Sequence, residues 1–288
     1  MIQLDAATVL LQWATGGLLF LWVTTRRREV GIGYGWLLRG VYGAMALGAV
    51  AAGIGLGSSA GRDVCSALTA VAALVALGVS IARRKAGVAG ERAREERVAA
   101  RLPSTGRSGD AAGGHSAPER PQNEFEPALD LVAPIIGAVG LVFAGLHASG
   151  GHDALSVART LAGAAFLGAV SDAMLLGHWY LVQPGLGREP LLELVRWTMW
   201  VWPFEVALLL IPPGMIDALT GHIDDGWDGT LAWFWVACAV TTIVLCFVTR
   251  AALKERAYSA VMAATGLLYL AILTAFGTDL VARAILAG

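Results

Sequence analysis

The stretch Leu131-Val-Ala-Pro-Ile-Ile-Gly-Ala-Val-Gly-Leu-Val-Phe-Ala144 decides the fold class of this chain. It holds no charged residue, and apolar and polar residues do not alternate along it. In lipid only α-helices and closed β-barrels satisfy every backbone N–H and C=O group, and barrel strands alternate apolar with polar residues. The stretch therefore predicts a transmembrane α-helix.

The whole chain has the composition of a polytopic membrane protein. Of its 288 residues 56% are hydrophobic and 15% are charged, whereas a soluble domain carries about 25% charged residues. The apolar residues fall into blocks of about 20, the length that crosses a hydrocarbon core about 30 Å thick. They predict an all-α protein with about eight transmembrane helices, at about 5–25, 34–57, 64–83, 127–148, 155–183, 190–213, 230–250 and 259–283. A net charge of −1 gives no indication of nucleic-acid binding.

Basic residues indicate the orientation of the predicted helices. Clusters of Arg and Lys follow the first and third helices and lie between the seventh and eighth, and Arg188 lies between the fifth and sixth. With eight helices all these places fall on one side, while the opposite loop at 215–229 contains four aspartates. Cytoplasmic loops are enriched in Lys and Arg. We therefore expect the basic side to be cytoplasmic and both termini to be external, with the bilayer of the cell membrane as the surroundings.

A polar segment, 84–126, separates two membrane segments. It is rich in charged residues, Pro, Ser and Gly and has no aromatic residue before Phe125, so it buries too little apolar surface to order itself. We expect a three-helix membrane segment over 1–83, a disordered cytoplasmic linker over 84–126 and a five-helix membrane segment over 127–288. The first apolar block lacks the positive start of a signal peptide, and we expect it to be retained.

The predicted helices at 155–183 and 190–213 carry the densest set of ionisable and aromatic residues. Ionisable groups inside a membrane are expensive and commonly functional. The candidate binding residues are Asp172, His178, Tyr180, Arg196, Trp200 and Glu205. In this interpretation His178, Tyr180 and Arg196 would donate hydrogen bonds to a quinone near the cytoplasmic leaflet. Trp200 would form a wall, and the two carboxyl groups would relay protons.

Structural roles remain open for all of these residues. Trp, Tyr and Arg near a membrane face form the ordinary interfacial belt, and either carboxylate could simply pair with Arg39 or Arg196. Asp279 and Arg283 are spaced i,i+4 on one helix and are expected to pair with each other.

The histidines argue against a haem b with two histidine ligands, because only His178 falls on the inner side of the membrane. A second group of polar residues falls on the outer side, and its spacing matches no strong metal-binding motif. We expect no metal there. Its members are His147, His152, Asp153, His222, Asp224 and Asp225.

Three functions remain open from the sequence, and none requires a particular enzymatic reaction. The first is a membrane subunit of an electron-transfer or respiratory assembly, with other redox subunits as partners and a quinone as the substrate. The second is a proton-coupled transporter that uses Asp172 and Glu205. The third is a structural or assembly protein that has no substrate.

Overall fold

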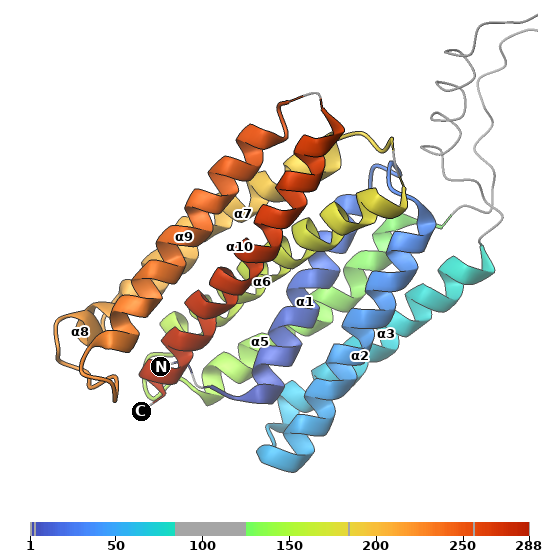
Figure 1. Cartoon of the computed structure of the whole chain (residues 1–288). Coiled ribbons are helices and arrows are strands. Elements are labelled where there is room, and N and C mark those ends of the chain that lie inside the picture. The colour runs from blue at the N-terminus through green and yellow to red at the C-terminus, as the bar shows by residue number, and fades with distance from the viewer. Residues whose placement is uncertain (1, 3, 84–124, 184, 256, 288) are drawn as a thin grey trace, which may run out of the picture.

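The computed structural model describes residues 2, 4–83, 125–183, 185–255 and 257–287, which form a bundle of roughly aligned helices (Figure 1). The long helices are α1 (Ala6–Thr25), α2 (Ile32–Leu56), α3 (Ala60–Ala82), α5 (Val132–His147), α6 (Asp153–Val182), α7 (Glu189–Leu210), α9 (Thr230–Ala252) and α10 (Tyr258–Leu286). A short 3-10 helix, η1 (Pro127–Leu131), precedes α5, and a short helix, α8 (Met215–Leu219), follows α7. The predicted all-helical, polytopic membrane fold is confirmed. Nearly all of the predicted linker, 84–124, lies outside the described residues.

Seven helical segments of the described chain are long and apolar enough to cross a membrane: α1, α2, α3, η1 with α5, α6, α9 and α10. The remaining long helix, α7, has 22 residues and is set apart by its charge. It nevertheless crosses the bundle, because α6 ends at one end of it and α9 begins at the other (Figure 1). With α7 the path of the described chain makes the eight passes that the sequence predicts.

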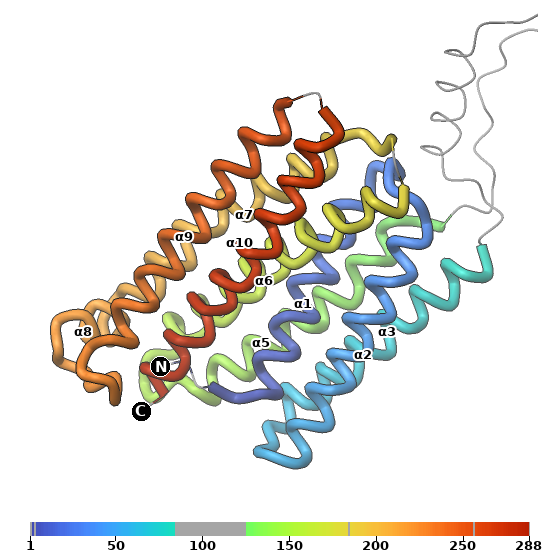
Figure 2. Tube along the Cα trace, in the orientation of Figure 1, coloured from blue at the N-terminus to red at the C-terminus, as the bar shows by residue number. Residues whose placement is uncertain are grey.

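Both termini lie at one end of the bundle, next to α8, as the trace in Figure 2 shows. We call this the terminal end. The opposite end, where α3 finishes and η1 begins, is called the linker end. An even number of passes brings the termini together in this way. Which end faces the cytoplasm stays a prediction.

Helix α6 runs through the centre of the bundle and contacts α1, α5, α7 and α10. Its contact with α1 depends on two glycines. A Cβ atom at Gly168 would lie 2.1 Å from the carbonyl carbon of Gly16, and a Cβ at Gly16 would lie 1.7 Å from the carbonyl oxygen of Ala164. Small residues let membrane helices approach closely, and here the two backbones leave no room for any side chain.

The start of α3 and the end of α7 differ by four and three residues from the sequence-based boundaries, for identifiable reasons. Helix α3 begins at Ala60 instead of 64 because its first turn includes Arg62 and Asp63, whose charges pair with each other. An acidic residue in the first turn also stabilises the helix dipole. Helix α7 ends at Leu210, just before Pro212 and Pro213, whose nitrogens cannot donate helical hydrogen bonds.

Candidate functional site

The structure places the six predicted site residues in several different surroundings. Asp172 and Glu205 are fully buried, and Tyr180 is 2% exposed. His178 is exposed on α6, where its Nδ1 lies 3.1 Å from the hydroxyl of Tyr269 on α10. The Tyr180 hydroxyl donates to the carbonyl oxygen of Gly187 in the following loop. Neither His178 nor Tyr180 is among the residues that line the groove beside Arg196.

Arg196 and Trp200 lie together on a groove of about 440 Å³ along the exposed side of α7. The groove is lined by Glu193, Arg196, Trp197, Trp200, Val201 and Phe204. Glu193 forms ion pairs with Arg26 and Arg27 at the end of α1, and Arg196 lies 3.5 Å from Glu189. The groove is thus apolar along its length and charged at the linker end.

Asp172 lies in the middle of the bundle, on α6 where it faces α2. The hydroxyl of Tyr42 donates to its Oδ1, and the hydroxyl of Tyr34 donates to its backbone carbonyl at 3.3 Å. Its Oδ2 is buried and has no hydrogen-bond partner. The neighbouring Ser171 accepts a hydrogen bond from the indole of Trp13 on α1 at 2.8 Å. One carboxyl oxygen of Asp172 therefore accepts a hydrogen bond, and the other is buried in the packed interior without a hydrogen-bond partner.

Glu205 belongs to a second buried cluster, about 8 Å in from the terminal end of α7 by the 1.5 Å rise per residue. Its neighbours include Asp279 and Arg283 of α10, whose charges act on it, as does that of Arg159 on α6. Both carboxyl oxygens of Glu205 are buried without a hydrogen-bond partner. Such an arrangement is rare, since buried polar groups are nearly always paired.

Two other members of this cluster, Asp279 and Arg283 of α10, are bound to each other and to Gln12 of α1. Arg283 donates from Nε to Asp279 at 2.8 Å, which confirms the predicted i,i+4 pair, and from Nη2 to the amide oxygen of Gln12. Gln12 in turn donates to Asp279 at 3.1 Å. A Cβ at Gly163 would lie 2.2 Å from Nε2 of Gln12, so the network needs a glycine at this point of α6.

Arg159 is a fully buried cation that the sequence analysis did not single out. Its Nε donates to the carbonyl of Leu208, and its Nη2 donates to the carbonyls of Ile211 and Pro213. A cation at a helix C-terminus satisfies free carbonyls and the negative end of the helix dipole. Its position inside an apolar block, six residues after the start of α6 at Asp153, was the signal that could have identified it.

A separate buried ion pair lies at the linker end. Arg39 donates from Nε and Nη2 to both carboxylate oxygens of Asp130, each at 2.7 Å. Both side chains are 3% exposed. Arg39 also donates to Ser80 at 3.3 Å and lies over the ring of Phe125. Arg39 and Arg196 thus have carboxylate partners other than Asp172 and Glu205.

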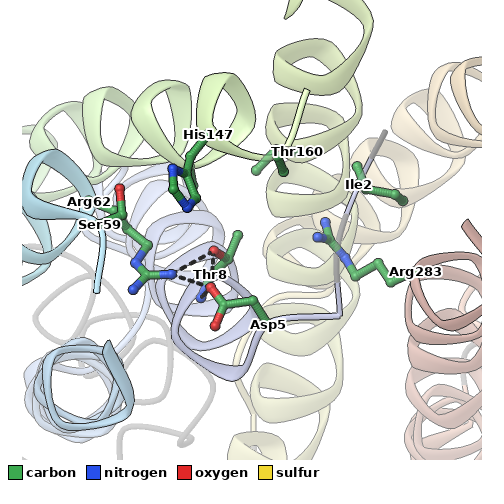
Figure 3. Close-up of a pocket in the computed structure, with 10 residues that line it drawn as sticks. Ile2, Asp5, Thr8, Ser59, Arg62, His147, Thr160 and Arg283 are labelled. Carbon is green, nitrogen blue, oxygen red and sulfur yellow. Dashed lines mark hydrogen bonds and ion pairs between the residues drawn. The ribbon is translucent and has the colours of Figure 1, made fainter. Parts of the chain in front are cut away.

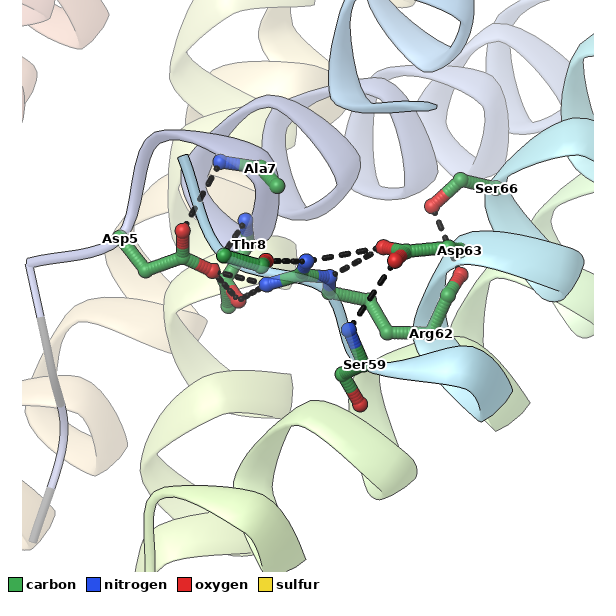
Figure 4. A network of polar contacts seen from close by, with 8 residues as sticks. Asp5, Ala7, Thr8, Ser59, Arg62, Asp63 and Ser66 are labelled. Carbon is green, nitrogen blue, oxygen red and sulfur yellow. Dashed lines mark hydrogen bonds and ion pairs between the residues drawn. The ribbon is translucent and has the colours of Figure 1, made fainter. Parts of the chain in front are cut away.

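A polar network closes the terminal end between α1 and α3 (Figure 4). Arg62 pairs with Asp5 and with Asp63, and it donates to the carbonyl of Gly57 at 2.7 Å. Beside it lies a cavity of about 20 Å³ (Figure 3), enough for one water molecule. Asp5, Arg62 and Arg283 are among its lining residues, as are His147 and Thr160. Arg283 therefore connects this cavity with the Glu205 cluster.

The outer polar residues considered as metal ligands engage in local contacts. Nδ1 of His222 lies 2.8 Å from the hydroxyl of Thr220. Asp225 accepts from the backbone N–H groups of Trp227, Gly229 and Ala232. Within the described ranges no group of three or more His, Cys, Asp or Glu side chains is placed to hold a metal ion.

The fold of this loop changes the pKa of the Asp225 carboxyl. Burial raises the pKa of its carboxyl, but the backbone N–H groups that point at it outweigh burial and lower the pKa below its usual value. The carboxylate therefore stays ionised and holds the start of α9.

No protein family, curated protein or solved structure matches the chain. The chain is a multi-span integral membrane protein, and its function has to be argued from its buried polar residues.

Proposed function

We propose that the protein is a proton-coupled membrane transporter in which Glu205 and Asp172 bind and release the protons. The proposal rests on buried carboxyl oxygens that have no hydrogen-bond partner. These are both oxygens of Glu205 and one oxygen of Asp172. An ionised carboxylate in such a place costs several kcal/mol. A carboxyl group that carries a proton avoids most of this cost, and it can release the proton when water or a counter-charge reaches it.

The rest of the bundle supports this interpretation. Arg39 donates hydrogen bonds to both carboxylate oxygens of Asp130. This buried pair shows that the bundle provides partners for charged groups that only hold the structure together. The cavity at the terminal end, which has room for one water molecule, is lined in part by Arg283, a member of the Glu205 cluster. Asp172 lies farther along the bundle, near the middle, where a second proton-binding group would be needed for transfer across the membrane.

Proton movement in proteoliposomes tests the proposal. Purified protein is reconstituted with a pH-sensitive dye inside the vesicles, and a potassium diffusion potential drives protons inward. We expect acidification faster than in protein-free vesicles, and we expect Glu205→Gln and Asp172→Asn to abolish the difference. Asp224→Asn, which changes an exposed carboxylate at the terminal end, is the matched control and should keep the flux. Unchanged flux in Glu205→Gln would contradict the proposal.

A second candidate function, a quinone-facing subunit of an electron-transfer or respiratory assembly, is favoured by the groove on α7. Its volume of about 440 Å³ is in the range of small-molecule sites, and Arg196 offers N–H donors beside the exposed indole of Trp200. Titration with a soluble quinone analogue should quench tryptophan fluorescence, and Trp200→Phe with Arg196→Ala should remove the effect. Equal quenching in that variant would remove the support for this candidate.

A further inference from the structure

Two side chains on adjacent helices have complementary atoms that lack a partner. Glu205 has two free acceptor oxygens, and Arg159 has one free donor, Nη1, although both side chains are buried. Of the described buried side chains, Arg159 is the only cation with such an unused N–H. Arg283, the other cation that acts on Glu205, is already bound to Asp279 and Gln12.

Arg159 contacts the backbone of α7 at a residue that lies about one helical turn beyond Glu205. Arg159 donates to the carbonyl of Leu208 at 2.9 Å, and Leu208 follows Glu205 by three residues on α7. Residues three apart are neighbours on a helix surface. The two charges act on each other, and Asp217 of α8 also acts on Arg159. The described residues nevertheless include no ion pair between Arg159 and Glu205, so one of the two must move before they can pair.

The position of Arg159 is fixed by the segment that follows α7. Its Nη2 donates to Ile211 at 2.6 Å and to Pro213 at 3.0 Å. Gly214 permits this arrangement, because a Cβ there would lie 2.2 Å from the carbonyl oxygen of Ile211 and 2.8 Å from Nη2 of Arg159. A shift of the guanidinium toward Glu205 would therefore weaken its bonds to the 211–214 segment.

We infer that Arg159 is the counter-ion that pairs with Glu205 when this carboxyl releases its proton, and that the pairing loosens the 211–214 segment at the terminal end. The inference rests on the proposed function. It adds Arg159 as a positioning residue, and it couples the release of the proton from Glu205 to loosening of the 211–214 segment. Proton release inside the bundle would change the structure at one surface only. A transporter needs such a link between protonation and access from one side.

The reporter for this coupling is a cysteine at Ile216, which is 44% exposed on α8. Cys65→Ser removes the partly exposed native thiol, while Cys238 and Cys246 are buried. The rate of reaction with a membrane-impermeant maleimide is measured over a range of pH in proteoliposomes. Thiol ionisation alone makes this rate rise with pH, so each rate is divided by that of the same reporter in the Glu205→Gln background.

We expect the ratio to rise with pH in the parent protein and in Asp224→Asn, and to stay flat in Arg159→Gln. If Arg159→Gln does not fold, Gly214→Ala provides the second variant. Its methyl group displaces the same segment, so the cysteine should react rapidly at every pH. A flat ratio in the parent protein, or a rise that persists in Arg159→Gln, would overturn the inference. Slow, parent-like labelling in Gly214→Ala would also overturn it.

Proton flux measured on the same vesicles separates the two claims. If Glu205→Gln abolishes the flux while the labelling ratio stays flat, the proposed function stands and the role of Arg159 is wrong. If Glu205→Gln leaves the flux unchanged, the proposed function itself fails.

Discussion

Two buried regions of this bundle differ in how their charged groups are partnered. At the linker end, Arg39 and Asp130 meet through two parallel hydrogen bonds, and Ser80 and Phe125 complete the surroundings of the arginine. Toward the terminal end, both carboxyl oxygens of Glu205 and Nη1 of Arg159 are buried without a hydrogen-bond partner. A buried pair that satisfies itself holds helices in place. A buried carboxyl group and a buried cation with atoms that lack partners retain the capacity to form new bonds, and the proposed proton chemistry rests on this second region.

The same chemical change made at Asp130 and at Asp172, which also has a buried oxygen without a partner, should give the largest difference in stability. Asp130→Asn removes the charge that compensates buried Arg39, and we expect a loss of about 3–5 kcal/mol of stability. Asp172→Asn keeps an oxygen that can accept from Tyr42, so its loss should be about 1 kcal/mol or less. Chemical unfolding of both variants in detergent measures the difference. Similar losses would mean that Asp172 is as structural as Asp130.

The next largest loss of stability is expected at the contact between α1 and α6 in the centre of the bundle. Gly168→Ala places a methyl group against the backbone of Gly16, and we expect a loss of about 1–3 kcal/mol or more from overpacking. Gly78→Ala is the matched control, because a Cβ at this position of α3 would meet nothing within 4 Å. A melting temperature for Gly168→Ala equal to that of Gly78→Ala would show that α1 and α6 are not in close contact.

Glu205→Gln should separate stability from function. The amide has nearly the shape of the carboxyl and also lacks a partner, so stability should change by about 1 kcal/mol or less, although proton flux is lost. The measurement is a thermal melt of the same sample that is used for the flux assay. A loss as large as that of Asp130→Asn would indicate that Glu205 is ionised and held by Arg159 or Arg283.

The smallest effect is expected in the loop before α9. Because the pKa of Asp225 is lowered in the folded loop, its stabilisation is present above the ordinary Asp pKa of about 3.9 and is lost as the pH falls through the lowered value. Hydrogen exchange at Ala232 should therefore accelerate at low pH. Asp225→Asn, which loses the Oδ2 acceptor for Ala232, should show fast exchange already at neutral pH. Asp224→Asn should behave like the parent protein, and an equal effect in both variants would contradict this role.

The fold could be predicted because apolar length and backbone hydrogen bonding leave a membrane segment few options. The pair Asp279–Arg283 was equally accessible, since both residues are on one helix. The other pairs could not be predicted because their members are far apart in the sequence. Arg39 and Asp130 are 91 residues apart, and Gln12 and Asp279 are 267 residues apart. Periodicity places a residue on a helix face but does not say which neighbour that face meets. The grouping of the six candidate residues into one quinone pocket therefore stays a prediction, and the structure places these residues in several different surroundings.

The protonation of Glu205 is the most direct test of the account. Infrared spectroscopy detects the carbonyl stretch of a protonated carboxylic acid, which disappears on ionisation. We predict that the parent protein at neutral pH shows such a band, that Glu205→Gln removes the contribution of Glu205 to it while that of Asp172 persists, and that Asp224→Asn leaves it unchanged. A spectrum at neutral pH in which Glu205→Gln removes only a carboxylate band would contradict the account, because Glu205 would then be a fixed negative charge in the bundle.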